Sequence, residues 1–265
     1  MPELPEVEAA RKAAAQHLTG RRVVQAKCVD DSIVLVDVTA RQVERALRGA
    51  VVKGTARFGK HLWFELDRKP WPVFHFGMTG GFRFYEKAAD APRFLKLELL
   101  LDNGKLFAFT DARRFGRLRL ANDPRNEPPL RSLGHDPFFA LPTAAQLAVE
   151  IGARKAPIKA VLLDQSTFAG VGNWIADEVL YQAGIAPQRV AANLSKAEIA
   201  RLRTTLLRVI RRAVSVDADS DKFPGTWLFH RRWGKVKGSK TLEGHDIVHD
   251  TVAGRTTAWV PTRQK

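Results

Sequence analysis

Residues 122–142 read NDPRNEPPLRSLGHDPFFALP, and this stretch separates two parts of the chain that have different periodicities. It is rich in proline and polar residues, and proline can neither donate to a strand ladder nor sit inside a helix. We therefore interpret residues 125–142 as a linker. It divides a β-sandwich domain at 1–124 from a helical domain at 143–222, which is followed by a hairpin segment at 223–265.

Short alternating or apolar runs fill the chain from residue 22 to residue 120, on the amino-terminal side of the linker. Runs with a period of two, separated by turn signals such as Asp102-Asn103-Gly104, predict strands that pack as a β-sandwich or barrel. The run IVLVDV at 33–38 is counted among these strands. One helix is expected near Thr39 to Leu47.

The period becomes helical from Thr143 onward. The longest helical run, SKAEIARLRTTLLRVIRRAVSV, begins at Ser195, which can form a capping box with Glu198. Near the end of the chain, IVHDTV and TTAWV flank Ala253-Gly254-Arg255, a pattern typical of a hairpin. The fold class predicted is α+β, with a sandwich, a small helical bundle and a terminal hairpin.

The composition favours a polyanionic partner. The 265 residues contain 43 Lys+Arg and 28 Asp+Glu, a formal net charge of +15, and 45% of them are hydrophobic, which excludes the disordered class. Nucleic acid is the commonest partner for such an excess, and a merely basic soluble protein is the alternative. A single cysteine, Cys28, excludes an internal disulfide, and no apolar run approaches the roughly 18 residues of a membrane span. We expect a reducing, intracellular location.

The first residues combine a candidate nucleophile with two carboxylates. Met1 precedes Pro2, a small residue after which the initiator methionine is normally removed, so the mature chain would begin with a secondary amine. Such an amine has an ordinary pKa of about 8 and can attack a carbonyl-like carbon to give an iminium. Glu3 and Glu6 could move protons beside it. Acidic residues ahead of a helix are also ordinary caps, which is the alternative for both.

Five further clusters contain residues typical of phosphate or base contacts, and each also has an ordinary structural interpretation. Glycines ahead of a helix let backbone N–H groups approach a phosphate, although a capped turn between helices has the same pattern. Two cations and an aromatic at a turn could place a wedge in a DNA groove, although exposed arginine turns are common. The clusters are FGKH at 58–61, HFGMTGG at 75–81, DARRFG at 111–116, FAGVGN at 168–173 and the hairpin tip Gly254-Arg255.

Six motifs, taken in their order along the chain, resemble the formamidopyrimidine-DNA glycosylase and endonuclease VIII family. They are MPELPEVE, Lys60, HFGMTGG, DARRFG, DQSTFAGVGNWIADEVL and GRTTAW. The opening MPELPEVE is similar to the formamidopyrimidine branch, and the resemblance covers nearly the whole chain. It implies a sandwich catalytic domain, a helix-two-turns-helix DNA-binding domain and a hairpin finger. It also implies a bifunctional DNA glycosylase and AP lyase of base excision repair, a monomer that acts on oxidised bases or abasic sites in double-stranded DNA.

The resemblance also implies roles for individual residues. Pro2 matches the nucleophile that attacks C1′, and Glu3 matches the acid that assists at the sugar ring. Glu6 matches a second acid, and Lys60 matches a lysine that binds phosphate near the lesion. The residues implied in DNA binding fill the gap left by a flipped base or bind phosphate. Met78, Arg113 and Phe115 form the first group, and Gly172, Asn173 and Arg255 the second.

Two departures from the family pattern affect the expectations. The tail from Trp227 has no cysteine, so we expect no cofactor and a zincless finger similar to plant and fungal members. We expect packing to hold this finger, through Trp233, Val236, Val248, Val252 and Trp259. The segment between Val214 and Trp227 is short, so weak activity on 8-oxoguanine is expected.

The alternatives to this function are an enzyme preferring oxidised pyrimidines, a non-catalytic DNA-binding protein, and an RNA or ribosome binder. The location implied is the cytoplasm or nucleoid of a bacterium, or a eukaryotic nucleus.

Overall fold

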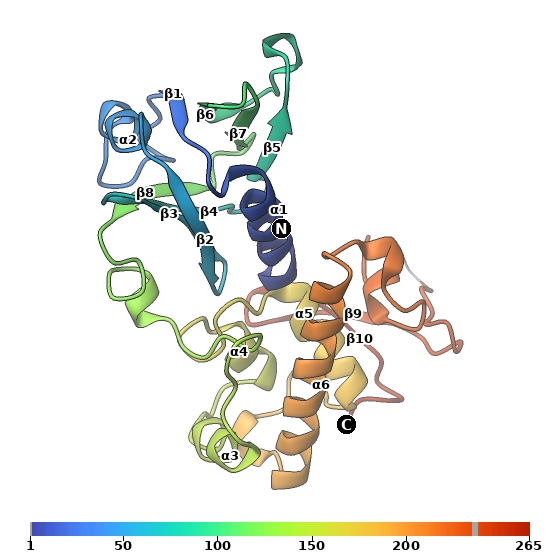
Figure 1. Ribbon diagram of the computed structural model, residues 1–265. Coiled ribbons are helices and arrows are strands. Elements are labelled where there is room, and N and C mark those ends of the chain that lie inside the picture. The colour runs from blue at the N-terminus through green and yellow to red at the C-terminus, as the bar shows by residue number, and fades with distance from the viewer. Residues whose placement is uncertain (1, 235–237) are drawn as a thin grey trace. The chain divides into compact units, whose positions relative to one another are not determined.

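The chain divides into two units, one ending at Ser132 and the other beginning at Leu133, within the stretch interpreted as the linker. The computed structural model describes residues 2–234 and 238–265. Figure 1 shows the sheets with helices α1 and α2 in the amino-terminal unit, and helices α3 to α6 with a β-hairpin in the carboxy-terminal unit. This mixed architecture confirms the predicted α+β class.

The amino-terminal unit contains two antiparallel four-stranded sheets, with strand orders β1-β6-β7-β5 and β2-β3-β4-β8. Helix α1 packs against β2, β3 and β5, and helix α2 packs against β1 and β4. Most strands follow one another through short turns, as the alternating sequence predicts. The bounds are α1 Leu4–Leu18, β1 Val23–Cys28, α2 Ala40–Leu47, β2 Val52–Phe58, β3 His61–Leu66, β4 Trp71–His75, β5 Gly81–Tyr85, β6 Leu95–Leu101, β7 Leu106–Thr110 and β8 Arg117–Ala121.

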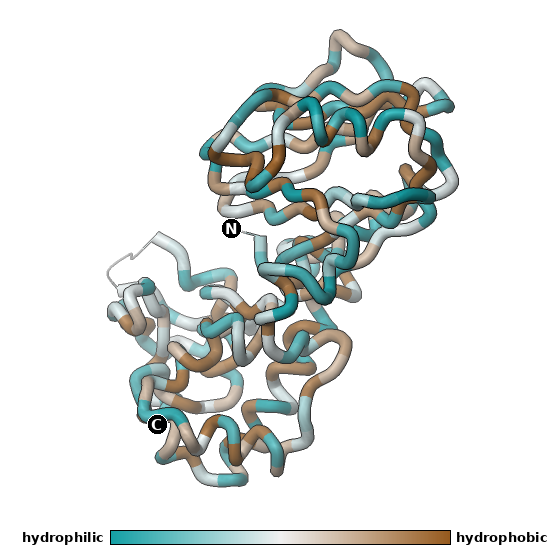
Figure 2. Tube along the Cα trace, turned by 90° about the vertical axis from the view of Figure 1, so that its left-hand side faces the viewer, coloured by the Kyte–Doolittle hydropathy of each residue, from teal (hydrophilic) through white to brown (hydrophobic). Residues whose placement is uncertain are grey.

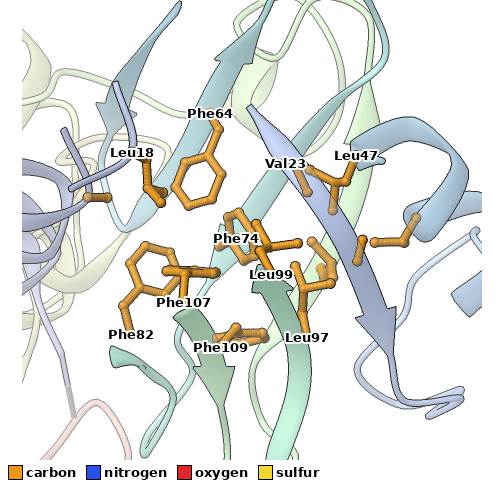
Figure 3. Packing of buried hydrophobic residues seen from close by; sticks show 14 of the residues in the cluster. Leu18, Val23, Leu47, Phe64, Phe74, Phe82, Leu97, Leu99, Phe107 and Phe109 are labelled. Atoms are coloured by element: carbon orange, nitrogen blue, oxygen red, sulfur yellow. The ribbon is translucent and has the colours of Figure 1, made fainter. Parts of the chain in front are cut away.

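A cluster of phenylalanines forms the centre of this unit. Phe74 and Phe82 meet nearly edge to face, with ring centroids 5.1 Å apart, and Phe64, Phe107 and Phe109 surround them. Figure 3 shows these rings pointing toward one another, with leucines and valines from α1, α2 and neighbouring strands beside them. Burying each such side chain contributes about 1.5–3 kcal/mol, so this core fixes the loops at the sheet edges.

The predicted strand at 33–38 is wrong, whereas the helix after it is confirmed. Asp31 accepts hydrogen bonds from the backbone N–H groups of Ile33 and Val34, and this local turn competes with a strand ladder. Only an isolated bridge from Leu35 to Leu118 remains. Helix α2 follows Thr39, whose hydroxyl accepts a hydrogen bond from the N–H of Gln42.

The carboxy-terminal unit is a helical bundle with a terminal hairpin. Helix α5 contacts helices α4 and α6 and also strand β10, so it joins the bundle to the hairpin. No helix among residues 2–234 and 238–265 is long and apolar enough to cross a membrane. The bounds are α3 Ala144–Gly152, α4 Ile158–Leu163, α5 Asn173–Ala183, α6 Lys196–Ser215, β9 Val248–Val252 and β10 Arg255–Trp259.

Short hydrophobic stretches alternate with hydrophilic ones along this unit, as Figure 2 shows by colour. In α6 this alternation is the helical period predicted from Thr143 onward, and it leaves one face buried, whereas α5 is buried on nearly all sides. Helix α6 begins as predicted, because the Ser195 hydroxyl accepts from the N–H of Glu198 and the Glu198 carboxylate accepts from the N–H of Ser195. The helical interpretation of this part of the chain is therefore confirmed.

The hairpin is confirmed, but the packing proposed for it needs correction. Ala253 and Gly254 both have positive φ, as a tight two-residue turn between paired strands requires. Trp233 is 53% exposed, and the Trp259 indole donates to Asp250 at 2.7 Å. Of the predicted valines, Val252 is buried and Val248 is exposed. A cluster of buried apolar residues lies beside the hairpin instead, formed by Tyr181, Leu228, Ile247, Ala258 and Val260. Val236 lies outside the described residues.

Candidate functional site

The start of α1 places the predicted nucleophile beside two carboxylates. Pro2 is half-buried in the extended segment before the helix, and Glu3 is almost completely buried. The Glu6 carboxylate accepts a hydrogen bond from the backbone N–H of Glu3 at 3.0 Å. Glu6 therefore caps the helix and fixes the direction of the chain that ends in Pro2.

A buried ion pair joins this helix to the turn that carries Lys60. Arg57, which is fully buried in β2, donates to Glu8 Oε2 at 3.0 Å and to the carbonyl of Gly59 at 2.8 Å. Burial opposes ionisation of Glu8, but hydrogen bonds from Arg11 and Arg57 outweigh it and hold its pKa below the ordinary value. The turn Gly59–Lys60, between Phe58 and His61, is thus held in place relative to α1.

The ion pair of Glu8 and Arg57 was not predicted from the sequence. The only signal was Glu8 itself, which lies one helical turn after the buried Leu4 and so falls on the apolar face of α1. A charged residue at such a position needs a buried partner. Its partner is distant in the sequence, so the pattern alone could not name it.

Two histidines on neighbouring strands, His61 at the start of β3 and His75 at the end of β4, are influenced by the charge of Lys60. The rings of His61 and His75 are 4.8 Å apart. Burial first, and then nearby charges including Lys60, lower their pKa values to about 3 and about 4. His75 Nδ1 accepts from the N–H of Gly77 at 3.1 Å, which leaves Nε2–H as a donor. Both rings are therefore neutral at physiological pH.

The structure brings together the three residues expected to fill the gap in a DNA stack. Met78 is 41% exposed and Phe115 is 46% exposed, although both are large apolar side chains. The guanidinium of Arg113 lies 4.9 Å from the centre of the Phe115 ring. Their loops, β4–β5 and β7–β8, touch through the backbones of Gly77 and Phe115.

In the carboxy-terminal unit, the structure links Asn173 to the hairpin. Gly172 is the N-cap residue of α5, and Asn173 is the first residue of the helix. The side-chain amide of Asn173 donates to the carbonyl of Thr256 at 2.9 Å. Thr256 follows the exposed Arg255 in β10, so this hydrogen bond joins Asn173 to the strand residue next to Arg255.

A buried charge cluster, formed by Lys159, Asp177 and Arg232, supports this link. Asp177 Oδ1 lies 2.6 Å from Lys159 Nζ, and its Oδ2 lies 2.6 Å from a nitrogen of Arg232. Lys159 also donates to the hydroxyl of Thr257 at 2.7 Å, and Asp177 accepts from the N–H of Ala258. The cluster therefore joins α4, α5 and β10. Lysine inside the apolar run IKAVLL was the signal for it in the sequence.

The three histidines of the tail have separate partners. His230 faces the carbonyl of Phe223, His249 faces the carbonyl of Arg232, and His245 lies near Glu243. Within the described part of the chain, no three His, Cys, Asp or Glu side chains are grouped so as to hold a metal ion. The zincless finger stays a prediction.

Comparison with known proteins defines the class first. The domain described as "Formamidopyrimidine-DNA glycosylase N-terminal domain" matches residues 1–118, and the corresponding "H2TH domain" matches residues 133–224. Together with the sandwich, the helical unit and the hairpin, these matches define the chain as a DNA glycosylase with a helix-two-turns-helix domain.

Relatives along the whole chain narrow this class to a family. A formamidopyrimidine-DNA glycosylase of Arabidopsis thaliana is 40% identical over 100% of this chain and 71% of its own length. One from Desulfitobacterium hafniense (strain DSM 10664 / DCB-2) is 33% identical over the full length of both chains. The chain belongs to the formamidopyrimidine-DNA glycosylase family.

Solved structures agree with this assignment. The Lactococcus lactis formamidopyrimidine-DNA glycosylase, bound non-covalently to DNA containing an abasic site, superposes with a TM-score of 0.88 at 26% identity over 99% of each chain. A variant of that enzyme bound to DNA containing a formamidopyrimidine lesion gives a TM-score of 0.87 at 26% identity over 100% of each chain.

Proposed function

We propose that the protein removes oxidised bases, above all formamidopyrimidines, from double-stranded DNA and then cleaves the strand at the abasic site. Full-length membership of the formamidopyrimidine-DNA glycosylase family supports base excision as the activity, and AP lyase activity is typical of that family. The observation that carries the proposal is the start of α1, where Pro2 precedes the buried Glu3 and Glu6 fixes the backbone between them.

The proposed reaction proceeds through the amine of a mature Pro2. The nitrogen lone pair attacks C1′, the bond to the base breaks, and the base leaves with the bonding electron pair and takes up the proton that the Pro2 nitrogen loses. Glu3 supplies a proton to the ring oxygen as the sugar opens, which gives an iminium between Pro2 and C1′. The iminium acidifies the proton at C2′, so elimination releases first the 3′ and then the 5′ phosphate.

The other predicted residues act on the DNA rather than on the bond that breaks. Lys60 lies at a turn held by Arg57, where an ammonium can pair with a phosphate near the lesion. Met78, Arg113 and Phe115 would occupy the space left by the extruded base, which otherwise costs a few kcal/mol of lost stacking. Gly172, Asn173 and Arg255 would bind phosphates from the carboxy-terminal unit.

The short segment after α6 supports a preference for formamidopyrimidines over 8-oxoguanine. Phe223 packs against Trp174 of α5 and against Trp227, with ring centroids 5.7 Å and 5.0 Å away. A segment pinned to the bundle by these rings has little length left to enclose a purine. Fewer donors and acceptors would then surround 8-oxoguanine, and water would compete for its polar groups. We further propose that the finger functions without zinc.

A panel of duplexes, each with one lesion opposite cytosine or adenine, tests this proposal. Single-turnover excision with saturating enzyme should be fastest for formamidopyrimidine and clearly slower for 8-oxoguanine. Equal rates for the two purines would show that the short segment does not set the substrate range. A preference for oxidised pyrimidines would favour an endonuclease VIII-like specificity, and binding without any cleavage would indicate a non-catalytic protein.

A further inference from the structure

Two apolar side chains lie exposed at loop tips, and neighbouring residues of the two loops hold these tips in place. The tip residues are Met78, in the loop between β4 and β5, and Phe115, in the loop between β7 and β8. The motif DARRFG also contains Asp111 and Arg114, to which the sequence assigned no function. The contacts of these two residues explain how the loops keep their shape.

Asp111 binds both loops with a single carboxylate. It is 1% exposed, its Oδ1 accepts from the hydroxyl of Thr79 at 2.6 Å, and its Oδ2 accepts from the N–H of Gly116 at 2.6 Å. The N–H of Arg113 lies 3.2 Å from both Asp111 Oδ1 and the Thr79 hydroxyl. A buried carboxylate with three donors is a strong, directional junction.

The backbones of the two loops are also in direct contact. Gly77 has a φ of 60°, and a Cβ built there would lie 2.3 Å from the carbonyl carbon of Phe115. Any side chain at this position would push the two loops apart. The loops therefore meet through glycine at one point and through Asp111 and Thr79 at another.

Arg114 supplies a second anchor for the β7–β8 loop. It has a φ of 58°, and its guanidinium forms three hydrogen bonds with the two carboxylate oxygens of Asp31, at 2.9 Å, 3.0 Å and 3.2 Å. Lys96 also binds Asp31, at 2.8 Å. Hydrogen bonds from Arg114 keep the pKa of Asp31 well below its usual range, so this anchor stays charged at physiological pH. Its two neighbours, Arg113 and Phe115, contact each other, with the Arg113 guanidinium 4.9 Å from the centre of the Phe115 ring.

We propose that Asp111 and Thr79 are positioning residues that present Met78, Arg113 and Phe115 as one preassembled wedge. The inference rests on the proposed function, because it takes base extrusion as the step that the wedge serves. Loops that had to order during insertion would lose conformational freedom at that moment. Loops already held by Asp111 lose little, so opening of the duplex becomes faster.

The test separates opening of the duplex from the chemistry that follows. A 2-aminopurine placed beside a formamidopyrimidine lesion reports opening in stopped-flow fluorescence. A single-stranded oligonucleotide with an abasic site needs no wedge and reports chemistry alone. Asp111→Asn should slow duplex opening by about tenfold or more, since small misplacements have effects of this size. Its cleavage of the single strand should stay close to the wild-type rate.

Matched variants keep the test decisive if Asp111→Asn folds poorly. Thr79→Val removes only the hydroxyl and should slow opening, whereas Thr79→Ser retains it and should restore the rate. Asp30→Asn removes a charge from an exposed position in the same unit and should change neither readout. The melting temperature of each variant is measured alongside.

Two results would overturn the inference. One is wild-type opening in Thr79→Val and in a folded Asp111→Asn. The other is an equal loss on the single-stranded abasic substrate, because a positioning role in the wedge cannot affect it. If the wild-type protein itself cleaves neither substrate, the proposed function fails instead, and the two failures are therefore distinguishable.

Discussion

At the scale of single residues, the chemistry depends on Pro2 and Glu3 having different tasks. Pro2 supplies the nucleophile, and the nearly buried Glu3 supplies a proton at the sugar. The sequence could predict both, because they lie next to each other at the chain start. Helix capping, the alternative that the sequence offered for Glu6, is what the structure shows, because the Glu6 carboxylate accepts a hydrogen bond from the backbone N–H of Glu3.

Glu3→Gln should slow excision of a formamidopyrimidine by about 100-fold, the size of a general-acid contribution. Cleavage of a preformed abasic site should fall much less, because its sugar already equilibrates with the ring-open aldehyde in water and depends less on a proton from Glu3. Single-turnover rates on the two substrates, measured with the same preparation, give the comparison. Equal losses on both would contradict the role assigned to Glu3.

His61 and His75 should make the fold sensitive to acid. Both have pKa values lowered from 6.5, to about 3 and about 4, so the unfolded chain takes up protons at a higher pH than the folded one. The free energy of unfolding should therefore fall as the pH drops from 6.5 toward 4, by up to about 1.4 kcal/mol per pH unit for each ring.

Urea denaturation between pH 4 and pH 7 measures this dependence. His61→Asn should reduce the slope, whereas His245→Asn, on the exposed surface, should leave it unchanged. An unaltered slope in His61→Asn would contradict burial of a neutral ring at this position.

At the scale of elements, local signals predicted the parts that depend on local chemistry. The capping residues Thr39 and Ser195 marked the starts of α2 and α6, and the Ala253-Gly254 turn marked the hairpin. The strand predicted at 33–38 failed because Asp31 offers the backbone a competing turn. Hydrophobicity alone could not reveal that competition.

Long-range charge pairs were the main part of the site that sequence patterns could not predict. Arg57 and Glu8 are 49 positions apart, and Arg232 and Asp177 are 55 apart. Each is a charged residue at an apolar position, which signals that a partner exists but not which one it is. The predicted packing of Trp233 was wrong, because the buried cluster beside the hairpin is formed by Tyr181 of α5, Leu228 and residues of the hairpin segment itself.

Asp177→Asn should destabilise the carboxy-terminal unit and weaken DNA binding together. The change leaves Lys159 and Arg232 buried without their shared carboxylate, which typically costs about 3–5 kcal/mol. Asp246→Asn, which breaks the exposed pair with Lys240, serves as the control and should cost at most about 1 kcal/mol. Melting temperature and fluorescence anisotropy on an abasic duplex measure the two effects. Equal stability of both variants would contradict the role of the cluster.

At the scale of the whole molecule, the net charge of +15 should govern affinity for DNA. With roughly five or six phosphates neutralised, log affinity should fall against log salt with a slope of about −5. Arg255→Ala should reduce this slope by about one, while Asn173→Ala should weaken binding at an unchanged slope. Anisotropy titrations across a series of salt concentrations measure these slopes. A nearly flat dependence would mean that the basic surface is not the binding surface.

Covalent trapping on abasic DNA tests the central claim, that the amine of Pro2 forms the bond to C1′. Borohydride should reduce the iminium to a stable amine, and peptide mapping should find the DNA attached to an N-terminal peptide that begins at Pro2. Pro2→Gly should trap poorly, and a chain with Met1 retained or its terminus acetylated should not trap at all. Full-yield trapping by the blocked chain, or an adduct at a lysine such as Lys60, would contradict the account.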